Sequence, residues 1–464
     1  MTGLTATLAA FLRDTTLADV PPEALDTAKK AIADTCAVIL AGAGSEVAPP
    51  LLRYVAHSGE RGASPILGSG QTAAPELAAL VNGTFGHALD FDDVLSLMPA
   101  HPSAVILPAL WAAPCPNPLT GSALIEAYIL GVEVGGKIGL AITVGHYNRG
   151  FHGTGTLAIF SAVGALAKRY HLDLATTRTA FGIAASMASG LQRNFGTMTK
   201  PLHTGWAARS ALAAVQLAGS GFTAAPDVLE APAGFFAAYG VEASRPEAAM
   251  EQLGHPWVMV DPGLALKRFP CCYAAHRGMD GVLQLRHRLG LTADTLERLV
   301  CRMPPGGMRV LTYPHPKTGL EGKFSLHYAL AAGVLDGQYT LWSFTDEAVN
   351  RPPIQALYPR LSVAEDPRCT GDDPLLETRS SGSRGVVEVE AVRTDGQRAT
   401  VRIARAPGHP SRALTWDDIA AKFLDCATHA RITPGKAERA FGLLKRLETC
   451  ADVHEVLTLL HGNA

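Results

Sequence analysis

The first half of the chain repeats apolar residues with the spacing of an α-helix. Between Leu25 and Ile39 apolar residues recur at steps of three or four positions, and Gly42 and Gly44 follow soon afterwards. An apolar face that stops at glycines is typical of a helix and its end. The pattern therefore predicts a helix that ends at these two glycines.

The same reasoning predicts three further helices. Thr120 and Asp173 have side chains that can accept a hydrogen bond at a helix start, and each precedes a long apolar stretch, the second ending near Gly190. Another stretch runs from about Gly205 to Ala218. These segments are apolar nearly all round, which is typical of helices buried inside a large helical body.

The pattern changes after about residue 255. Residues 299–303 have the character of a short strand, and residues 385–403 alternate apolar and polar side chains around Asp395-Gly396, as in a β-hairpin. The intervening residues 365–384 are rich in Asp, Pro, Ser and Gly, which favours a surface loop.

Helical signals return at the end of the chain. Thr415 and Asp418 have the spacing of a capping box, and residues 434–460 are helical in pattern. We therefore predict a mainly α protein with a smaller α/β (α+β) part inserted between a long helical block and a short helical tail.

Composition narrows the class of protein. The 464 residues favour two domains over one, and 47% hydrophobic with 18% charged residues is typical of a globular protein. A net charge of -2 with no run of like charge gives no basic patch of the kind that binds nucleic acid. We find no signal-peptide pattern and no uninterrupted apolar stretch of membrane-spanning length. The eight cysteines form no CxxC, so we expect no zinc knuckle and a reducing cytoplasmic location.

Candidate chemistry is concentrated in residues 82–103. This stretch interleaves apolar side chains with five ionisable ones, namely His87, Asp90, Asp92, Asp93 and His101. Burial and mutual repulsion raise the pKa of a carboxyl group, and a nearby cation lowers it, so such a set can hold a proton donor and an acceptor near neutral pH. The step from His87 to Asp90 would let both share a helix face. The alternative is that Asp92 and Asp93 only cap or solvate a helix end and that His101 is a hydrogen-bonded turn residue.

Two other polar segments lie beside apolar helices. Lys200 and His203 stand just before the predicted helix start at Gly205, where an anion is favoured; the alternative is a solvated lysine and a capping histidine. Lys267 opens the inserted part and could face an anionic ligand. Cys272 is either a reactive thiol or a small buried residue.

These segments resemble the MmgE/PrpD family, which includes 2-methylcitrate dehydratase, cis-aconitate decarboxylase and iminodisuccinate epimerase. The match extends over nearly the whole chain in eight ordered blocks: NGTFGHALDFDD, AHPS, GFHGTGTLAIF, TMTKPLHTG, LKRFPCCYAAH, GLEGKFSLHYA, LDG and NRP. The resemblance implies a helical domain of residues 1–262 plus 411–464 and an inserted α/β lid of residues 263–410. It also implies a homodimer and a cofactor-free site between the two domains.

The resemblance also implies particular site residues. The cis-aconitate decarboxylase pattern places catalytic or binding roles at Asp90, His101, His152, Lys200 and Tyr328. Val94 stands where those enzymes have a threonine, Cys272 stands where they have a histidine, and the interval from Asp90 to His101 is one residue longer. Other blocks look closest to the iminodisuccinate epimerase branch, although Tyr328 keeps the lyase pattern.

All three activities move a proton at a carbon next to a carboxylate, which requires a base and positive groups near the developing charge. We expect Lys200, His101 and Lys267 to hold carboxylates or stabilise that charge, and Asp90, His152 and Tyr328 to transfer protons. His203 and Cys272 complete the expected substrate-binding set, with no metal.

The predicted function is a cofactor-independent lyase that dehydrates or decarboxylates a small di- or tricarboxylate. The alternatives are an epimerase acting on a substituted succinate and a carboxylate-binding protein without activity. The sequence predicts no nucleic-acid or membrane partner.

Overall fold

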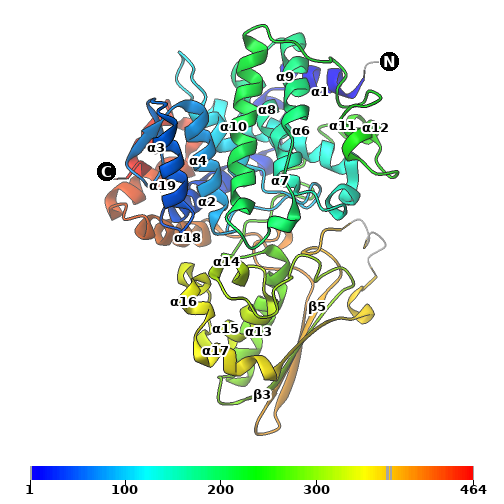
Figure 1. Ribbon diagram of the computed structural model, residues 1–464, viewed down its shortest axis with the longest axis vertical. Helices are drawn as coiled ribbons and strands as arrows, with labels where there is room; N and C mark the ends of the chain where they lie inside the picture. Colours follow the sequence, from blue (N-terminus) through cyan, green and yellow to red (C-terminus); the bar gives the residue numbers. More distant parts are fainter. Residues whose placement is uncertain (1–2, 373–375, 377–378, 463–464) are drawn as a thin grey trace. The chain divides into compact units, whose positions relative to one another are not determined.

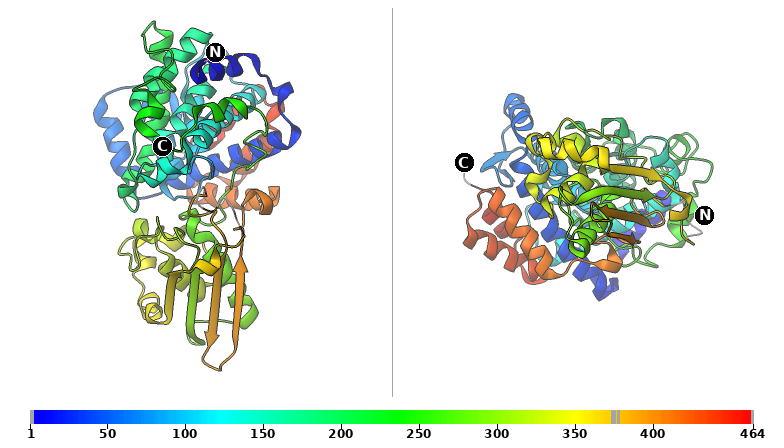
Figure 2. Two further views of the ribbon diagram at one scale, coloured as in Figure 1. Left: turned by 90° about the vertical axis from the view of Figure 1, so that its right-hand side faces the viewer. Right: turned by 90° about the horizontal axis from the view of Figure 1, so that it is seen from below.

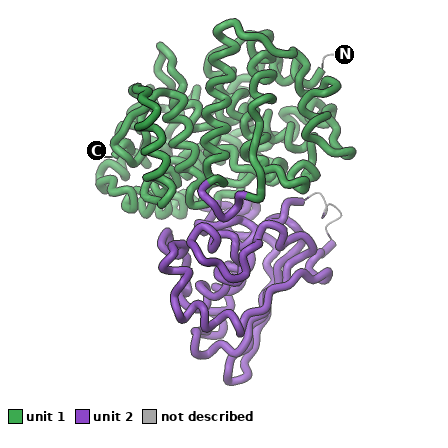
Figure 3. Tube along the Cα trace, viewed as in Figure 1, with its two compact units in different colours: residues 1–193, 199–266, 415–464 green, residues 194–198, 267–414 purple. Residues whose placement is uncertain are grey.

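The computed structural model describes residues 3–372, 376 and 379–462, and these divide into two compact units (Figure 3). Unit 1 comprises residues 1–193, 199–266 and 415–464, and unit 2 comprises residues 194–198 and 267–414. The unit boundaries lie four residues beyond the predicted domain boundaries at 262 and 410. The short segment 194–198 groups with unit 2 although it lies within the predicted helical domain.

Unit 1 is built almost entirely of helices (Figure 1). Its small two-stranded sheet pairs β1 (Ser64–Ile66) with β2 (Gln71–Ala73). The helices have the following bounds: α1 Leu4–Asp14, α2 Pro22–Ala43, α3 Ala48–Ser58, α4 Pro75–Ala88, α5 Ser103–Ala112, α6 Gly121–Asn148, α7 Gly153–Thr156, α8 Ala158–Arg169, α9 Leu174–Met187, α10 Thr199–Gly219, α11 Phe235–Tyr239, α12 Pro246–Glu251, α18 Trp416–His429, α19 Pro434–Lys445 and α20 His454–Leu460.

Three of the predicted helix starts, at Thr120, Asp173 and Thr415, are confirmed by single hydrogen bonds. Thr120 accepts a bond from the backbone N–H of Ala123 at the start of α6, and Asp173 accepts one from Thr176 at the start of α9. Thr415 and Asp418 form a reciprocal capping box on α18. Each cap satisfies N–H groups that have no partner inside the helix.

The long helix α6 is a core element. By length and composition it could cross a membrane, but 89% of its most apolar 18-residue window is buried inside the protein. The consecutive helices α2 and α3 are apolar and long enough to cross a membrane only if they are counted as one span, and the pair is bent by 87°. Apolar side chains all round a helix are therefore explained here by packing against neighbouring helices.

The end of the chain returns to its beginning within unit 1. Helices α18 and α19 both pack on α2, and the views in Figures 1 and 2 show these C-terminal helices beside the N-terminal ones. Residues about 390 positions apart, such as Asp26 and Trp416, form a direct side-chain hydrogen bond.

Unit 2 contains a four-stranded sheet in the order β4-β3-β5-β6. Strand β3 (Leu296–Met303) pairs in parallel with β4 (Leu361–Glu365) and antiparallel with β5 (Val387–Arg393), and β6 (Arg398–Ile403) completes the predicted hairpin. Helices α13 (His276–Leu289) and α15 (Leu326–Asp336) lie against this sheet (Figure 2). The unit also contains α14 Gly319–Gly322, α16 Asp346–Val349 and α17 Pro352–Leu357.

The mainly α fold with a smaller α/β part is thus confirmed. The predicted surface loop, residues 365–384, falls partly outside the described residues; its described part includes a 3-10 turn at Pro367–Cys369. One boundary prediction is wrong: α10 begins at Thr199, not near Gly205, so Lys200 and His203 lie inside its first turns.

Candidate functional site

A loop between α4 and α5, residues 89–102, carries all three acidic residues of the motif. Helix α4 ends at Ala88, so the expectation that His87 and Asp90 share a helix face is wrong. Asp90 instead adopts a left-handed backbone conformation with φ of 50°. Non-glycine residues pay a steric cost there and are kept in place by their surroundings, commonly at functional positions.

The loop is tied to another part of unit 1 by backbone hydrogen bonds. Val94 N donates to Ala265 O over 2.8 Å, and Ala265 N donates to Val94 O over 3.0 Å. Within the loop, Leu95 N donates to Ala100 O over 2.9 Å. The acids therefore sit on a braced turn and not on a helix end exposed to water.

A chain of hydrogen bonds joins this loop to α10. The ammonium group of Lys200 lies 2.6 Å from His87 Nε2 and 3.1 Å from Asp90 Oδ2. The other ring nitrogen, His87 Nδ1, lies 2.8 and 2.9 Å from the two carboxylate oxygens of Asp92. Lys200 can only donate as an ammonium, so His87 accepts at Nε2 and donates from Nδ1 to Asp92. All four side chains are buried.

His101 approaches the same place from the end of the loop. Its Nδ1 donates to the carbonyl oxygen of Asp93 over 2.6 Å and lies 3.5 Å from Asp92 Oδ2. Its backbone N–H donates to Thr154 Oγ1 over 3.2 Å. With Nδ1 committed to a carbonyl oxygen, a neutral His101 ring has its lone pair on Nε2.

His152 and His203 form a second pair. Their Nδ1 atoms lie 3.0 Å apart, so one ring donates and the other accepts. Burial, followed by the positive charge of Lys200, keeps the pKa of His152 well below its usual value. The same two causes lower the pKa of His203 to about 4. Both rings are therefore neutral at neutral pH, with one proton held between them.

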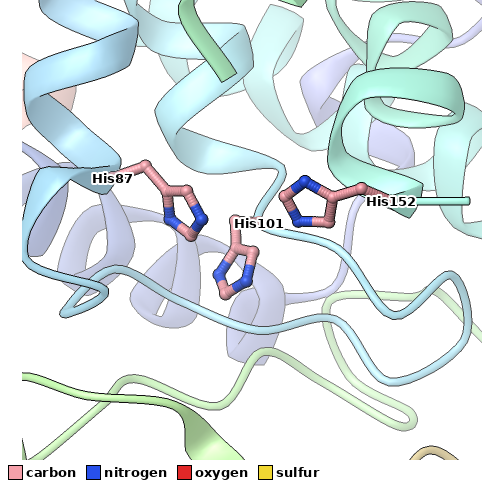
Figure 4. Close-up of side chains that lie close together, drawn as sticks. All are labelled: His87, His101 and His152. Atoms are coloured by element: carbon pink, nitrogen blue, oxygen red, sulfur yellow. The ribbon is translucent and has the colours of Figure 1, made fainter. Parts of the chain in front are cut away.

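The three imidazole rings of His87, His101 and His152 face a common space (Figure 4). The ring centroids are 4.2 Å apart for His87 and His101, 5.8 Å for His87 and His152, and 6.1 Å for His101 and His152. We call the set of unit 1 residues around this space the polar cluster: His87, Asp90, Asp92, His101, His152, Lys200 and His203.

The polar cluster has atoms placed for a metal ion. Ligand atoms of His87, His101 and His152 lie within 4.8 Å of one another, and so do those of His87, Asp90, Asp92 and His101. Imidazole nitrogens suit zinc and similar ions. However, both nitrogens of His87 already have partners, and a cation at Nε2 would have to displace the ammonium of Lys200. Metal independence stays a prediction.

Asp93 behaves differently from its neighbours in the motif. Ser103 Oγ donates to Asp93 Oδ2 over 2.5 Å and also lies 2.5 Å from the hydroxyl of Tyr128. Burial, together with the charges of Asp92 and Asp34, raises the pKa of Asp93 to about 8, although the bond from Ser103 opposes this. Asp93 is therefore mainly protonated at neutral pH, and its backbone carbonyl is the part that contacts His101.

The structure places the remaining predicted residues in unit 2. Lys267 is fully buried, and the backbone N–H of Cys272 donates to Lys323 O over 3.0 Å. The hydroxyl of Tyr328 donates to the carbonyl oxygen of Ser343, and burial raises the pKa of Tyr328 above its usual value. Their participation in a site together with the polar cluster stays a prediction.

His87 and Asp92 lie in the motif but were not among the expected site residues. The structure shows that they connect Lys200 to the loop. Their closeness to Asp90 in the motif was the available signal, but nothing local in the sequence indicated that Lys200 would contact His87 and Asp90.

The fold and the polar cluster together define a two-domain protein whose helical part carries a buried centre equipped for proton transfer. Comparison with known families makes the class specific. The MmgE/PrpD N-terminal domain matches residues 6–246, and the MmgE/PrpD C-terminal domain matches residues 269–447. The chain therefore belongs to the MmgE/PrpD family.

Curated relatives named cis-aconitate decarboxylase match most of the chain. The mouse protein is 29% identical over 447 residues, covering 94% of this chain and 88% of the relative. The human protein is 27% identical with coverage of 99% and 95%, and that of Aspergillus terreus is 27% identical with coverage of 88% and 86%. None of these three is an epimerase, so the closer similarity to the iminodisuccinate epimerase branch is not shown.

Proposed function

We propose that this protein is a lyase that removes one carboxyl group, as carbon dioxide, from a small tricarboxylate of the cis-aconitate type. The observation that carries the proposal is the ammonium of Lys200, held 3.1 Å from Asp90 and 2.6 Å from His87 beside two further imidazoles. A fixed cation next to proton-transfer groups is what such a reaction requires. The names of the relatives support the same reaction class.

The chemistry of the reaction defines what the residues of the site must do. The bond between carbon and the leaving carboxylate breaks, its electron pair moves into the conjugated carbon chain, and a carbon next to a second carboxylate takes up a proton. One proton is consumed for each carbon dioxide released. The site must therefore stabilise transient negative charge and supply one proton to carbon.

Lys200 is the group that we assign to the negative charge. It is buried, so its electrostatic effect is stronger than it would be in water. Asp90 and His87 fix the position of its ammonium, and Asp92 in turn orients His87. We therefore assign Asp90 to positioning Lys200, in place of the proton-transfer role predicted from the sequence.

His101 and His152 are the groups that we assign to proton transfer. His101 keeps Nδ1 on a backbone carbonyl oxygen, so its Nε2 is the atom that exchanges a proton. His152 shares a proton with His203 and has a strongly lowered pKa, so it gives up any added proton readily. A weakly basic imidazole is suited to protonating carbon once it has been charged.

The other predicted residues and properties belong to the same proposal. We expect Lys267, His203 and Cys272 to contribute to substrate binding and Tyr328 to contribute to catalysis. We further expect the enzyme to need no cofactor, to act in the cytoplasm and to form a homodimer. Dehydration of a related tricarboxylate is the second reaction that the same groups could perform.

Incubation with cis-aconitate, 2-methylcitrate and a substituted succinate in deuterated water tests the proposal. We expect release of carbon dioxide from cis-aconitate and one deuterium in the product. Carbon-13 NMR detects the product, and a bicarbonate assay measures the carbon dioxide. Lys200→Met serves as the matched variant and should release carbon dioxide about 10³-fold less efficiently.

Other outcomes would contradict the proposal. Loss of water without carbon dioxide would identify a dehydratase. Deuterium entering an unchanged carbon skeleton would identify an epimerase. Tight binding of a tricarboxylate with no exchange and no product would identify a binding protein.

A further inference from the structure

The C-terminal helix α18 reaches the loop of the polar cluster through one buried side chain. Lys422 Nζ donates to the carbonyl oxygen of Phe91 over 2.8 Å and lies 2.7 Å from Asp34 Oδ1 on α2. The same ammonium lies 3.7 Å from the centroid of the Phe91 ring. The side chains of Lys422 and Asp34 are only 2% and 1% exposed.

Phe91 is the residue between Asp90 and Asp92. Asp90 contacts Lys200, and Asp92 contacts His87, so the peptide groups flanking Phe91 set the positions of both carboxylates. Asp90 has a left-handed backbone, and such a conformation persists only where its surroundings impose it. The hydrogen bond from Lys422 fixes the carbonyl group of Phe91, the residue that follows Asp90.

Stability alone is a poor explanation for a buried lysine here. Removing two charges from water costs about as much as their attraction returns, and apolar pairs of similar size often replace buried ion pairs without loss. The site of the hydrogen bond is more informative. In the 89–102 loop, Lys422 binds the carbonyl oxygen of Phe91. This carbonyl lies between Asp90, which contacts Lys200, and Asp92, which contacts His87.

We propose that Lys422, held in place by Asp34, is a positioning residue for the polar cluster. It acts through the Phe91 carbonyl to keep Asp90 and Asp92 where they orient Lys200 and His87. This inference rests on the proposed function in so far as the polar cluster is the catalytic centre. It also assigns a role to α18, a helix of unit 1 that follows unit 2 in the sequence.

The test uses two matched double variants of the full chain. Asp34→Leu with Lys422→Met removes both charges together, so no uncompensated charge stays buried. Glu133→Leu with Lys137→Met is the control, because this second buried pair of unit 1 also has a lysine that binds a backbone carbonyl, that of Pro256, over 2.7 Å. Lys422→Arg tests rescue by another cation.

The first readout is steady-state kinetics on the tricarboxylate that the wild-type enzyme decarboxylates. We expect the Lys422 double variant to lose about 10–100-fold in kcat, the size of effect that a misplaced catalytic group produces. Lys422→Arg should recover part of the loss, and the Lys137 double variant should keep kcat within about twofold. Wild-type kcat in the Lys422 double variant, or an equal loss in the control, would overturn the proposal.

The second readout does not depend on any substrate. Nitrogen-15 labelling of histidine reports the His87 Nδ1 proton, which is bonded to Asp92. We expect this resonance to shift in the Lys422 double variant and to stay in place in the control. If the wild-type protein decarboxylates nothing, a shift confined to the Lys422 variant still supports positioning, whereas identical spectra would overturn it.

Discussion

Lys200 in unit 1 and Arg277 in unit 2 are both buried cations, yet their surroundings differ in kind. Lys200 contacts two side chains that can gain or lose protons, His87 and Asp90. Arg277 donates instead to three backbone carbonyls, those of Arg384 at 2.5 Å, Gly385 at 2.9 Å and Ser381 at 3.3 Å. Carbonyl oxygens cannot exchange protons, so Arg277 fixes a loop while Lys200 belongs to a proton-transfer network.

The pKa values support the same contrast. Burial lowers the pKa of Arg277 to about 10, which still leaves it charged at neutral pH. Burial and the charge of Lys200 lower the pKa values of His152 and His203, that of His203 to about 4. A buried charge is therefore no sign of a functional site by itself. The informative feature is whether its partners titrate.

The largest effect is expected for Lys200→Met. Loss of the ammonium removes the charge that stabilises the reacting substrate, so kcat/KM should fall by about 10³-fold. Lys200→Arg should restore little, because a planar guanidinium does not fit a point between His87 and Asp90. Steady-state kinetics on folded protein, checked by circular dichroism, measures this. A fall of less than about threefold would remove Lys200 from the proposed mechanism.

Arg277→Met should affect stability and leave the chemistry nearly intact. It leaves three carbonyl groups without their shared donor, and we expect unfolding to become easier by about 3 kcal/mol. Urea unfolding measures the loss. At a temperature well below the melting point, kcat should change by less than about fivefold. If kcat fell as far as in Lys200→Met, the distinction between the two cations would be wrong.

The smallest effect is a difference in pH dependence. The pKa of His203 is about 4 in the folded protein and about 6.5 when unfolded, so the unfolded chain takes up a proton first as the pH falls. Stability should therefore be full above pH 6.5 and decrease towards pH 4. The contribution of His203 is about 2 kcal/mol after allowance for the partly exposed ring.

His203→Asn should flatten this dependence, and Arg277→Met should not change its slope between pH 4 and 8, because Arg277 is charged in both states throughout that range. Unfolding free energies measured at several pH values decide between these outcomes. An unchanged slope in His203→Asn would show that another group carries the dependence.

Much of the fold could be predicted from local sequence signals. The helix caps at Thr120, Asp173 and Thr415 and the turn of the β-hairpin depend on neighbouring residues, and each formed as predicted. The parallel pairing of β3 with β4 could not be predicted, because its strands are separated by about sixty residues. Helix α10 also began earlier than expected, because a proline in the first turn removes no intrahelical hydrogen bond and the helix packs on α4.

By itself, the sequence determined the family, the mainly helical architecture and the motif that carries His87 to His101. These depend on periodicity and on residues close together in the chain, for which spacing is sufficient evidence. The tertiary structure alone decided that Lys200 binds His87 and Asp90, that Asp93 holds a proton, and that Lys422 contacts the Phe91 carbonyl 331 residues away. Contacts of this kind depend on how helices pack and on which charges lose water, and neither leaves a regular spacing in the sequence.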